Sequence, residues 1–434
     1  MKTVVIIGAG PCGLLIAHYL LRRENQYCIE LYDKRSDPRL MPISTERSHS
    51  ISLGFRGRAA LRQIGLESLA IERGVLASIQ EIYNSRGVVK SMLRKQPRLI
   101  IERNVLTNLL LETLIESDDP SRLKIHFDWE CIDIDTKAKL AFFQSASGYR
   151  RSQVYDLLIG ADGIRSKVRN VLQHKTELEV RLDKGPLEIK NLTLRCPEKY
   201  PELNFKKNSV NAYCLGAFGT LVSFSKPDGT YSGLVGFTRG YNNLAQISSS
   251  SGILKFFRKH MGALSELISL EEADAFAQKP FFQTTTVICN RYHFSNSVLL
   301  MGDAAHAVSP LIGQGCSSSL EDSLLFDQLL DKFDDDLNQA LPQFTQSRLP
   351  DMIALAQIAD NLFSLNLYIG YLMLLKHIFD RTLHYWFPNF WTSSFVDMLA
   401  ESTIPYSKIL QSHSLWIKTI SFLNQLILRK NSIT

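Results

Sequence analysis

The chain of 434 residues lacks the features that mark several classes of protein. Its seven cysteines are odd in number and show no metal-site spacing, so we expect no bound metal and a reducing compartment such as the cytoplasm. The most apolar late run, residues 362–375, is shorter than the roughly 20 residues that cross a bilayer. The net charge of +6 is scattered along the chain, which argues against a nucleic-acid partner.

The N-terminus has the pattern of a nucleotide-binding unit. Residues 3–7 read as a buried parallel strand, and Gly8, Gly10 and Gly13 follow directly, before a helix. In this pattern the first glycine allows a tight turn, the second lets the backbone approach a pyrophosphate, and the third lets helix and strand pack closely. Asp33 ends the next strand, where a carboxylate binds an adenosine ribose. We therefore predict a dinucleotide cofactor and no signal peptide; a glycine turn that binds nothing is the alternative.

Two later segments have a similar form. Residues 155–169 lead from an apolar strand into a turn that contains Asp162. Taken without the other motifs, this segment also fits an ordinary strand-to-helix corner. Residues 298–315 lead from an apolar strand into Gly302 and Asp303, and then into a helix start that contains Gly313 and Gly315. Backbone N–H groups at a helix start suit the phosphate-bearing tail of a flavin, so this segment predicts FAD.

The order of these motifs, GAGPCG near residue 10, GADG near 162 and GDAAH near 304, resembles that of the single-component FAD-dependent (group A) aromatic hydroxylases. Residues 47–58, 101–106, 326–333 and 340–350 resemble kynurenine 3-monooxygenases more specifically. Residues 401–406, with Trp416, are also similar to the violacein-pathway indole hydroxylase. The resemblance implies an α/β fold: a Rossmann-like FAD-binding domain interleaved with a β-sheet substrate domain, plus a C-terminal helical region. The expected ranges are 1–72, 99–182 and 285–335 for the first, 73–98 and 183–284 for the second, and 336–434 for the third.

The resemblance also implies site residues. Asp162 is expected near flavin and nicotinamide, and Asp303 near the ribityl-pyrophosphate. The full expected cofactor set is Gly8, Gly10, Gly13, Asp33, Lys34, Arg35, Arg47, Arg103, Asp162, Asp303, Gly313 and Gly315. The expected catalytic and substrate-side residues are Pro310, Asn361 and Tyr406, with Pro310 lining the flavin. We expect His306 to support the Gly-Asp loop rather than to react.

The implied activity is that of an FAD-dependent monooxygenase. It would use NAD(P)H and O2 to hydroxylate an electron-rich aromatic substrate, tryptophan- or kynurenine-derived or indolic, through a flavin hydroperoxide. Only one dinucleotide fingerprint is present, so NADH or NADPH would dock transiently as a co-substrate. The alternative is a flavoprotein reductase or redox-neutral cyclase of the same fold that acts on a hydrophobic substrate. We expect a cytoplasmic protein with at most peripheral membrane contact.

One departure from the family concerns the substrate. In kynurenine 3-monooxygenases an Arg and a Tyr hold the substrate carboxylate, and a gapless alignment places Gln80 and Pro97 at those positions. Gln lacks the charged, bidentate fork of Arg. Kynurenine is therefore expected to be a poor substrate unless another arginine replaces the clamp. The candidates, which are otherwise solvated loop charges, are Arg86, Arg94 and Arg98.

Overall fold

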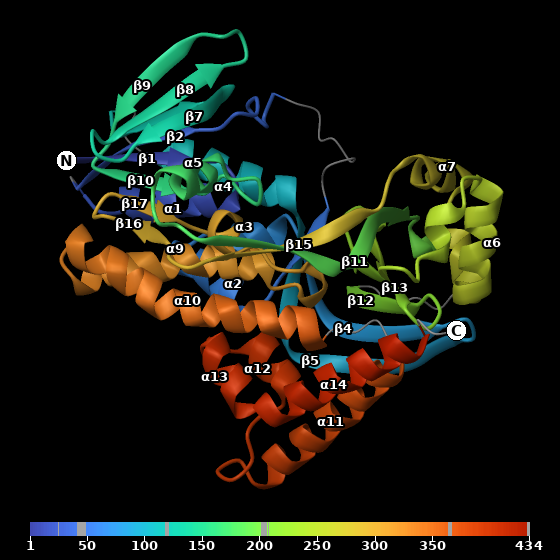
Figure 1. Ribbon diagram of the computed structural model, residues 1–434. Helices are drawn as coiled ribbons and strands as arrows, with labels where there is room; N and C mark the ends of the chain where they lie inside the picture. The colour runs from blue at the N-terminus through green and yellow to red at the C-terminus, as the bar shows by residue number, and fades with distance from the viewer. Residues whose placement is uncertain are drawn as a thin grey trace. The chain divides into compact units, whose positions relative to one another are not determined.

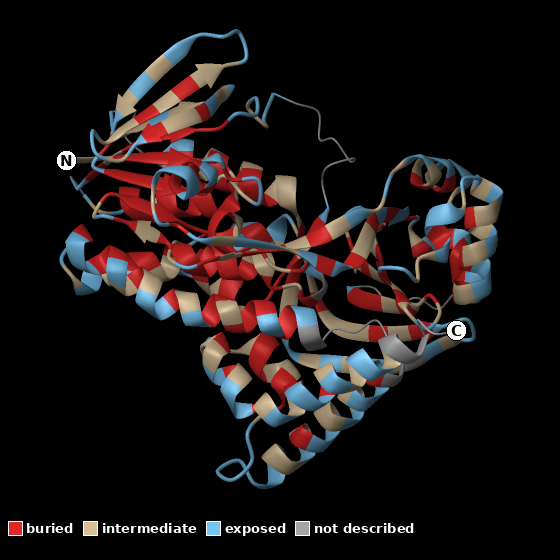
Figure 2. Ribbon diagram, in the orientation of Figure 1, coloured by how far each residue is buried: buried red, intermediate tan, exposed pale blue. Residues whose placement is uncertain are grey.

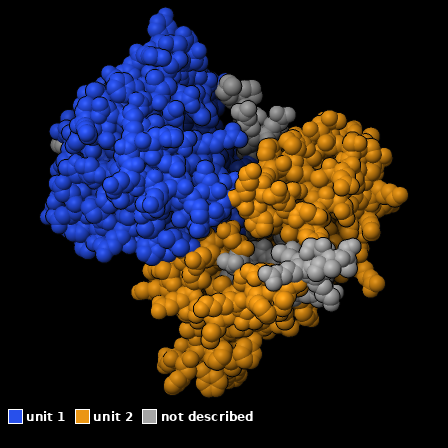
Figure 3. Space-filling model, in the orientation of Figure 1, with its two compact units in different colours: residues 1–72, 102–183, 285–353 blue, residues 73–101, 184–284, 354–434 orange. Residues whose placement is uncertain are grey.

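The structure, a computed structural model, describes the chain apart from residues 25, 41–48, 118–120, 201–205, 207, 363–366 and 432–434. It divides into two compact units (Figure 3). The first contains residues 1–72, 102–183 and 285–353, and the second contains residues 73–101, 184–284 and 354–434. Residues 354–434, which the sequence analysis set within a separate helical region, thus belong to the second unit. The domain boundaries drawn from the sequence stay a prediction.

The first unit is organised around a sheet with the order β16-β17-β10-β1-β2-β6 (Figure 1). Its strands are β1 (Lys2–Ile7), β2 (Tyr27–Tyr32), β6 (Leu123–His126), β10 (Leu157–Gly160), β16 (His293–Phe294) and β17 (Val298–Leu300). All pairings are parallel except that of β16 with β17. Strands β1 and β10 are nearly continuous apolar runs because helices and loops cover both faces of a parallel sheet.

Helices surround this sheet. They are α1 (Pro11–Leu21), α2 (Phe55–Gln63), α3 (Glu67–Glu72), α4 (Arg103–Ser117), α5 (Lys167–Lys175), α8 (Asp303–His306), α9 (Gly315–Lys332) and α10 (Leu337–Leu362). The unit also contains β3 (Ser50–Leu53), a small sheet of β7 (Trp129–Asp135), β8 (Leu140–Ser145) and β9 (Arg150–Val154), and the short turn η5 (Pro310–Ile312). Every residue of α1 except His18 is buried, so α1 lies inside the unit.

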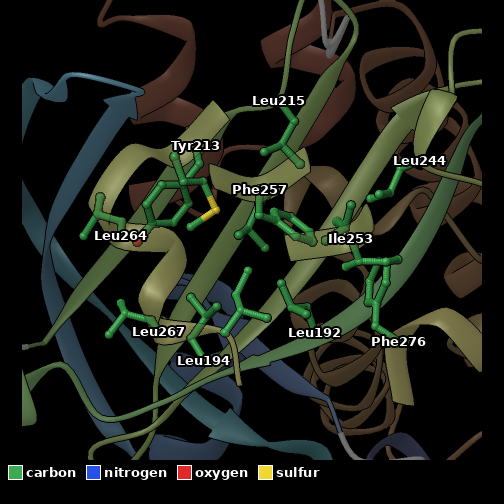
Figure 4. Close-up of a cluster of buried hydrophobic side chains, with 14 of the residues drawn as sticks. Leu192, Leu194, Tyr213, Leu215, Leu244, Ile253, Phe257, Leu264, Leu267 and Phe276 are labelled. Atoms are coloured by element: carbon green, nitrogen blue, oxygen red, sulfur yellow. The ribbon is translucent and has the colours of Figure 1, made fainter. Parts of the chain in front are cut away.

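The second unit is organised around a sheet in which strands follow the order β15-β11-β14-β13-β12-β4-β5. They are β4 (Val75–Asn84), β5 (Gly87–Glu102), β11 (Val180–Leu194), β12 (Ser209–Cys214), β13 (Gly219–Ser225), β14 (Tyr231–Thr238) and β15 (Phe282–Cys289). Burial alternates along β13, as expected when one sheet face is packed. Helices α6 (Ser250–Met261) and α7 (Leu270–Gln278) cover that face through an apolar cluster that includes Leu192, Tyr213 and Phe257 (Figure 4).

The C-terminal part of the second unit is helical. It consists of α11 (Leu367–Trp386), α12 (Phe395–Glu401), α13 (Tyr406–Ser412) and α14 (Ser414–Asn431). Within the described part of the chain, none of the helices combines the length and hydropathy needed to traverse a bilayer. The α/β class, the Rossmann-like sheet and the C-terminal helical region predicted from the sequence are confirmed.

Candidate functional site

Three strand ends of the first unit lie at one edge of its sheet. Because β1, β10 and β17 are parallel neighbours, the turns that follow them emerge on the same side. A Cβ added to Gly8 would lie 2.4 Å from the carbonyl oxygen of Ala161, and one added to Gly302 would lie 3.2 Å from Sγ of Cys12. The three sequence motifs therefore meet. This carboxyl edge is where open α/β sheets bind their ligands.

The glycines of the first turn differ in their surroundings. A Cβ at Gly13 would lie 1.9 Å from the carbonyl oxygen of Gly8, so this glycine is required by packing within the chain. The nearest atom to a Cβ at Gly10 is Nη2 of Arg103, 4.0 Å away. Gly10 is also the N-cap of α1, without a side-chain cap. The start of α1 therefore borders open space, with one guanidinium beside it, and this combination fits an anionic phosphate.

Asp33 presents a charged carboxylate at the same turn. Its Oδ2 accepts a hydrogen bond from the Ala9 N–H at 2.7 Å, and its Oδ1 accepts one from the Arg35 N–H at 2.8 Å. Burial acts to raise the pKa of Asp33, but the hydrogen bonds and the charge of Arg35 hold this pKa below its ordinary value. Lys34 is directed elsewhere, since its Nζ lies 3.6 Å from Oε1 of Glu130. Asp33 is thus an ionised hydrogen-bond acceptor at the turn between β1 and α1.

The two carboxylate oxygens of Asp162 differ in their hydrogen bonds. Its Oδ2 accepts hydrogen bonds from the N–H groups of Lys167 at 2.6 Å and Val168 at 3.2 Å. Its Oδ1 is buried and has no hydrogen-bond partner among the residues that the structure describes. Burial raises the pKa of Asp162. A buried acceptor of this kind is costly unless something binds it, so Asp162 fits a position beside a bound cofactor.

A buried charge network lies behind the third turn. Oδ2 of Asp322 accepts the Gly302 N–H at 2.8 Å and lies 2.6 Å from Nε2 of His306. Oδ1 of Asp322 accepts Nε–H of Arg348 at 2.7 Å. Burial acts to raise the pKa of Asp322, but His306 and Arg348 hold it below its ordinary value. The geometry places His306 as a support of the Gly302 loop.

This network continues to Glu321, which binds Arg348 at 2.8 Å and Arg56 at 2.6 Å. Sequence reasoning missed Asp322, Glu321, Arg348 and Arg56. The sequence offered a weak indication of the two acidic residues. Glu321 and Asp322 lie close after a run of small residues, 317–319, and such a run is typical of a buried helix face.

The other site residues expected from the sequence lie in the segment that follows β17, from α8 to the start of α9. Pro310 is exposed in η5, Gly313 has a φ of +60° at the end of η5, and Gly315 begins α9. A φ in that region favours glycine. Asp303 begins α8 and is half-buried. Arg47 lies outside the described residues.

A second cluster of chemistry-bearing residues lies in the second unit. Strand β5 bulges against β4, since Leu93 pairs with Ile79 and Arg98 pairs with Ala77. The bulge carries Arg94, whose guanidinium donates a hydrogen bond to Oε1 of Gln80. A bulge re-aims side chains in this way.

Arg98 and Tyr406 belong to the same cluster. Burial and then the nearby charge of Arg94 lower the pKa of Arg98, while Glu401 and Tyr406 act to raise it. Tyr406 is fully buried at the start of α13. Arg86, by contrast, is exposed in the β4–β5 turn, where its N–H bonds Oδ1 of Asn84. The side chain of Asn361 is not among those described. No group of three or more His, Cys, Asp or Glu in the described ranges could hold a metal ion.

Comparison with known proteins places these sites in context. A family model, FAD binding domain, matches residues 1–209 and 259–347. The kynurenine 3-monooxygenase of Sus scrofa is 28% identical over 82% of this chain and 74% of its own length. The kynurenine 3-monooxygenase of Legionella pneumophila (strain Corby) is 28% identical over 94% of this chain and 90% of its own. Violacein synthase of Chromobacterium violaceum is 24% identical over 96% of this chain and 99% of its own.

Solved structures share the fold. The tetrameric form of 2-methyl-3-hydroxypyridine-5-carboxylic acid oxygenase is similar with a TM-score of 0.67 and 17% identity, over 83% of this chain and 90% of that one. PqsL of Pseudomonas aeruginosa, in complex with 2-aminobenzoylacetate, is similar with a TM-score of 0.63 and 20% identity, over 83% and 95% of the two chains.

Proposed function

Because this chain belongs to the FAD binding domain family, we propose that it is an FAD-dependent monooxygenase that hydroxylates an electron-rich aromatic substrate with NAD(P)H and O2. The observation that carries the proposal is the meeting of three motif turns at one sheet edge, where Gly10 borders open space. The similarity to kynurenine 3-monooxygenases over most of the chain supports the same reaction class. The seven cysteines are free, which supports a reducing, cytoplasmic compartment.

The residues at this edge suit the parts of FAD in turn. The start of α1 and Arg103 would hold the pyrophosphate, and Asp33 would hold the adenosine ribose. Asp162 and Asp303 would lie toward the flavin end, where Pro310 would line the ring. When bound there, FAD would supply the hydride acceptor for NAD(P)H and the means to activate O2. The protein's own tasks are then to orient the aromatic ring and to exclude water.

We further propose that the substrate carries an acidic group. Arg94 and Arg98 place two positive charges close together in surroundings that lower the pKa of both. Nε of Arg94 is buried and has no hydrogen-bond partner within the described part of the chain. An anion would relieve both the repulsion and the desolvation. A tryptophan- or kynurenine-derived or indolic acid fits this requirement.

Kynurenine itself stays a predicted poor substrate. The two arginines come from β5, whereas Gln80, which the gapless alignment sets at the position of the family's clamping Arg, lies on β4. A carboxylate held from a different strand would set the ring of kynurenine in a different place, and a misplacement of about 1 Å costs roughly 100-fold in rate. Turnover of kynurenine at the rate of the best substrate would contradict this expectation.

The test compares aromatic substrates with and without their carboxylate, such as indole-3-acetate and 3-methylindole. We expect the acid to have the higher kcat/KM by roughly 30- to 1000-fold, about 2 to 4 kcal/mol, the usual worth of a charged hydrogen-bonded contact. Substrate-stimulated NAD(P)H oxidation and incorporation of one atom from labelled O2 are measured together. Substrate-dependent NAD(P)H oxidation that incorporates no oxygen into the product and releases no hydrogen peroxide would instead indicate a reductase.

Two arginine variants locate the acidic group. Arg94→Met should reduce the preference for the acid, whereas Arg86→Met, at an exposed turn, should leave it unchanged. Equal effects of the two substitutions would remove the β5 bulge from the substrate site but would leave the proposed reaction standing.

A further inference from the structure

One carboxylate lies near the two arginines of β5 in the second unit. Glu401 is the last residue of α12 and is half-buried. Its charge acts on both Arg94 and Arg98, where it opposes the lowering of their pKa by burial. Within the part of the chain that the structure describes, the Glu401 carboxylate forms no hydrogen bond or ion pair. The carboxylate therefore faces the guanidinium groups without being bound to them.

The helix that carries Glu401 does not explain this position. The dipole of a helix disfavours a carboxylate at its C-terminal end. Asp397 on the same helix is different, because its N–H donates to Oγ of Ser394 at 3.2 Å and its carboxylate lies 3.3 Å from Nε of Arg381. Helix α12 packs through its buried residues (red in Figure 2), which are Phe395, Met398, Leu399 and Ala400. Of the two acidic residues on α12, Glu401 is thus the one that no contact in the described chain holds.

Two neutral side chains belong to the same cluster. Oε1 of Gln80 accepts a hydrogen bond from the Arg94 guanidinium, and the buried Tyr406 lies close enough to Arg98 to affect its pKa. These side chains leave the charges unbalanced. Two guanidinium groups and the Glu401 carboxylate are therefore left to interact with a ligand.

This arrangement of charges restricts the acid that binds. A simple carboxylate would be attracted by the two guanidinium groups, but Glu401 would repel it. An acid with an N–H group beside its carboxylate avoids the conflict, because the N–H donates to Glu401 while the carboxylate accepts hydrogen bonds from the arginines. Partial burial strengthens both interactions, since water competes less for the charged groups.

We propose that Glu401 is a specificity-determining residue that accepts a hydrogen bond from a nitrogen on the carbon that bears the substrate's carboxylate. This role rests on the proposed function, in which Arg94 and Arg98 bind an acidic group. Two kinds of aromatic acid have such a nitrogen. An α-amino acid carries a charged ammonium there, and an indole-2-carboxylate carries a neutral ring N–H. The N–H donor beside the acid is the chemistry that they share.

The test is calorimetric titration of the full-length, FAD-loaded protein with two matched pairs of acids, so that binding is measured without turnover. One pair is L-tryptophan and indole-3-propionate, which lacks the amine. The other pair is indole-2-carboxylate and benzofuran-2-carboxylate, in which oxygen replaces the N–H. We expect the N–H member of at least one pair to bind roughly 10- to 100-fold more tightly, the usual effect of a hydrogen bond to a charged group.

Substitutions at Glu401 identify the source of this preference and distinguish the two kinds of acid. Glu401→Leu should abolish the preference in either pair. Glu401→Gln should remove a preference for tryptophan, whose ammonium requires a negative charge, but should keep much of a preference for indole-2-carboxylate, because the amide oxygen still accepts a hydrogen bond. Glu271→Gln is the matched control, since Glu271 is exposed on α7 in the same unit, and its affinity ratios should be unchanged.

Absorbance of bound FAD in each variant establishes that the chain is folded. Two results would overturn the proposal. One is the absence of any preference of the wild-type protein for the N–H member of either pair. The other is an unchanged affinity ratio in both Glu401 variants, as expected if Glu401 is only a counter-ion that weakens every acid equally. A preference that depends on Glu401, without incorporation of oxygen into either bound acid, would support this role of Glu401 but refute the proposed reaction.

Discussion

Substitutions at Gly10 and Gly13 separate cofactor binding from folding, although these glycines are only three residues apart. A Cβ at Gly10 has no neighbour nearer than 4.0 Å, and its φ of −84° suits any residue. Gly10→Val should therefore lower the stability of the FAD-free chain by about 1 kcal/mol at most, the usual penalty at an N-cap. Its side chain would occupy the place of the pyrophosphate. The loss of two charged hydrogen bonds, about 3 to 6 kcal/mol, corresponds to a roughly 10²- to 10⁴-fold weaker FAD affinity.

Gly13→Ala should act through the fold. Its Cβ would meet the Gly8 carbonyl oxygen at 1.9 Å, so α1 must move away from β1 within a closely packed interior. Overpacking of this kind costs about 1 to 3 kcal/mol or more, and we expect Tm of the FAD-free protein to fall by roughly 3 to 10 °C.

Two measurements on FAD-free protein distinguish these effects: thermal unfolding by circular dichroism and titration with FAD followed by flavin fluorescence. Gly10→Val should unfold near the wild-type temperature and bind FAD poorly. Normal FAD binding by Gly10→Val would refute the assignment of the pyrophosphate site. A wild-type unfolding temperature for Gly13→Ala would refute the packing argument.

Three further predictions follow from the site. Asp322→Asn should destabilise the chain by about 3 to 5 kcal/mol, because it removes the buried carboxylate that pairs with Arg348. Asp331→Asn on the same helix, 69% exposed, should cost at most about 1 kcal/mol, and equal urea midpoints of the two variants would contradict this. The pKa of Asp322 is depressed in the folded state, so the stability that its carboxylate contributes is present above the ordinary carboxyl pKa and is lost as pH falls through the depressed value. The difference in free energy of unfolding between wild type and Asp322→Asn should therefore become smaller in acid. Asp303→Ala should weaken FAD binding or turnover without lowering Tm, and a fully active variant would make this residue structural only. Tyr406→Phe should keep the flavin spectrum but lower the ratio of hydroxylated product to NAD(P)H consumed, and unchanged coupling would remove Tyr406 from the substrate site.

The cofactor end of the first unit was predictable because its determinants are local. A buried strand, a glycine turn and a helix start follow one another within about a dozen residues, and the spacing of the glycines is enough to identify the turn. Gly8 and Gly13 are each required by a close backbone neighbour. Asp33, Asp162 and Asp303 follow strands β2, β10 and β17, which are parallel, so chain order and the rules for parallel sheets suffice to bring them to one edge. The positions of these residues relative to bound FAD stay a prediction.

The sequence alone therefore determined the α/β class, the FAD motifs and the order of the segments, since strand and helix periodicity and turn chemistry act over short distances. Only the tertiary structure decided which distant groups meet. Arg56, Glu321 and Arg348 join in one network although they are far apart in the chain, and the β5 bulge brings Arg94 to Gln80. Helix α11 shows the same limit. Its periodicity predicts two faces, but which face is buried depends on partners such as Ser394 and Trp391, because packing outweighs the intrinsic preference of one helix.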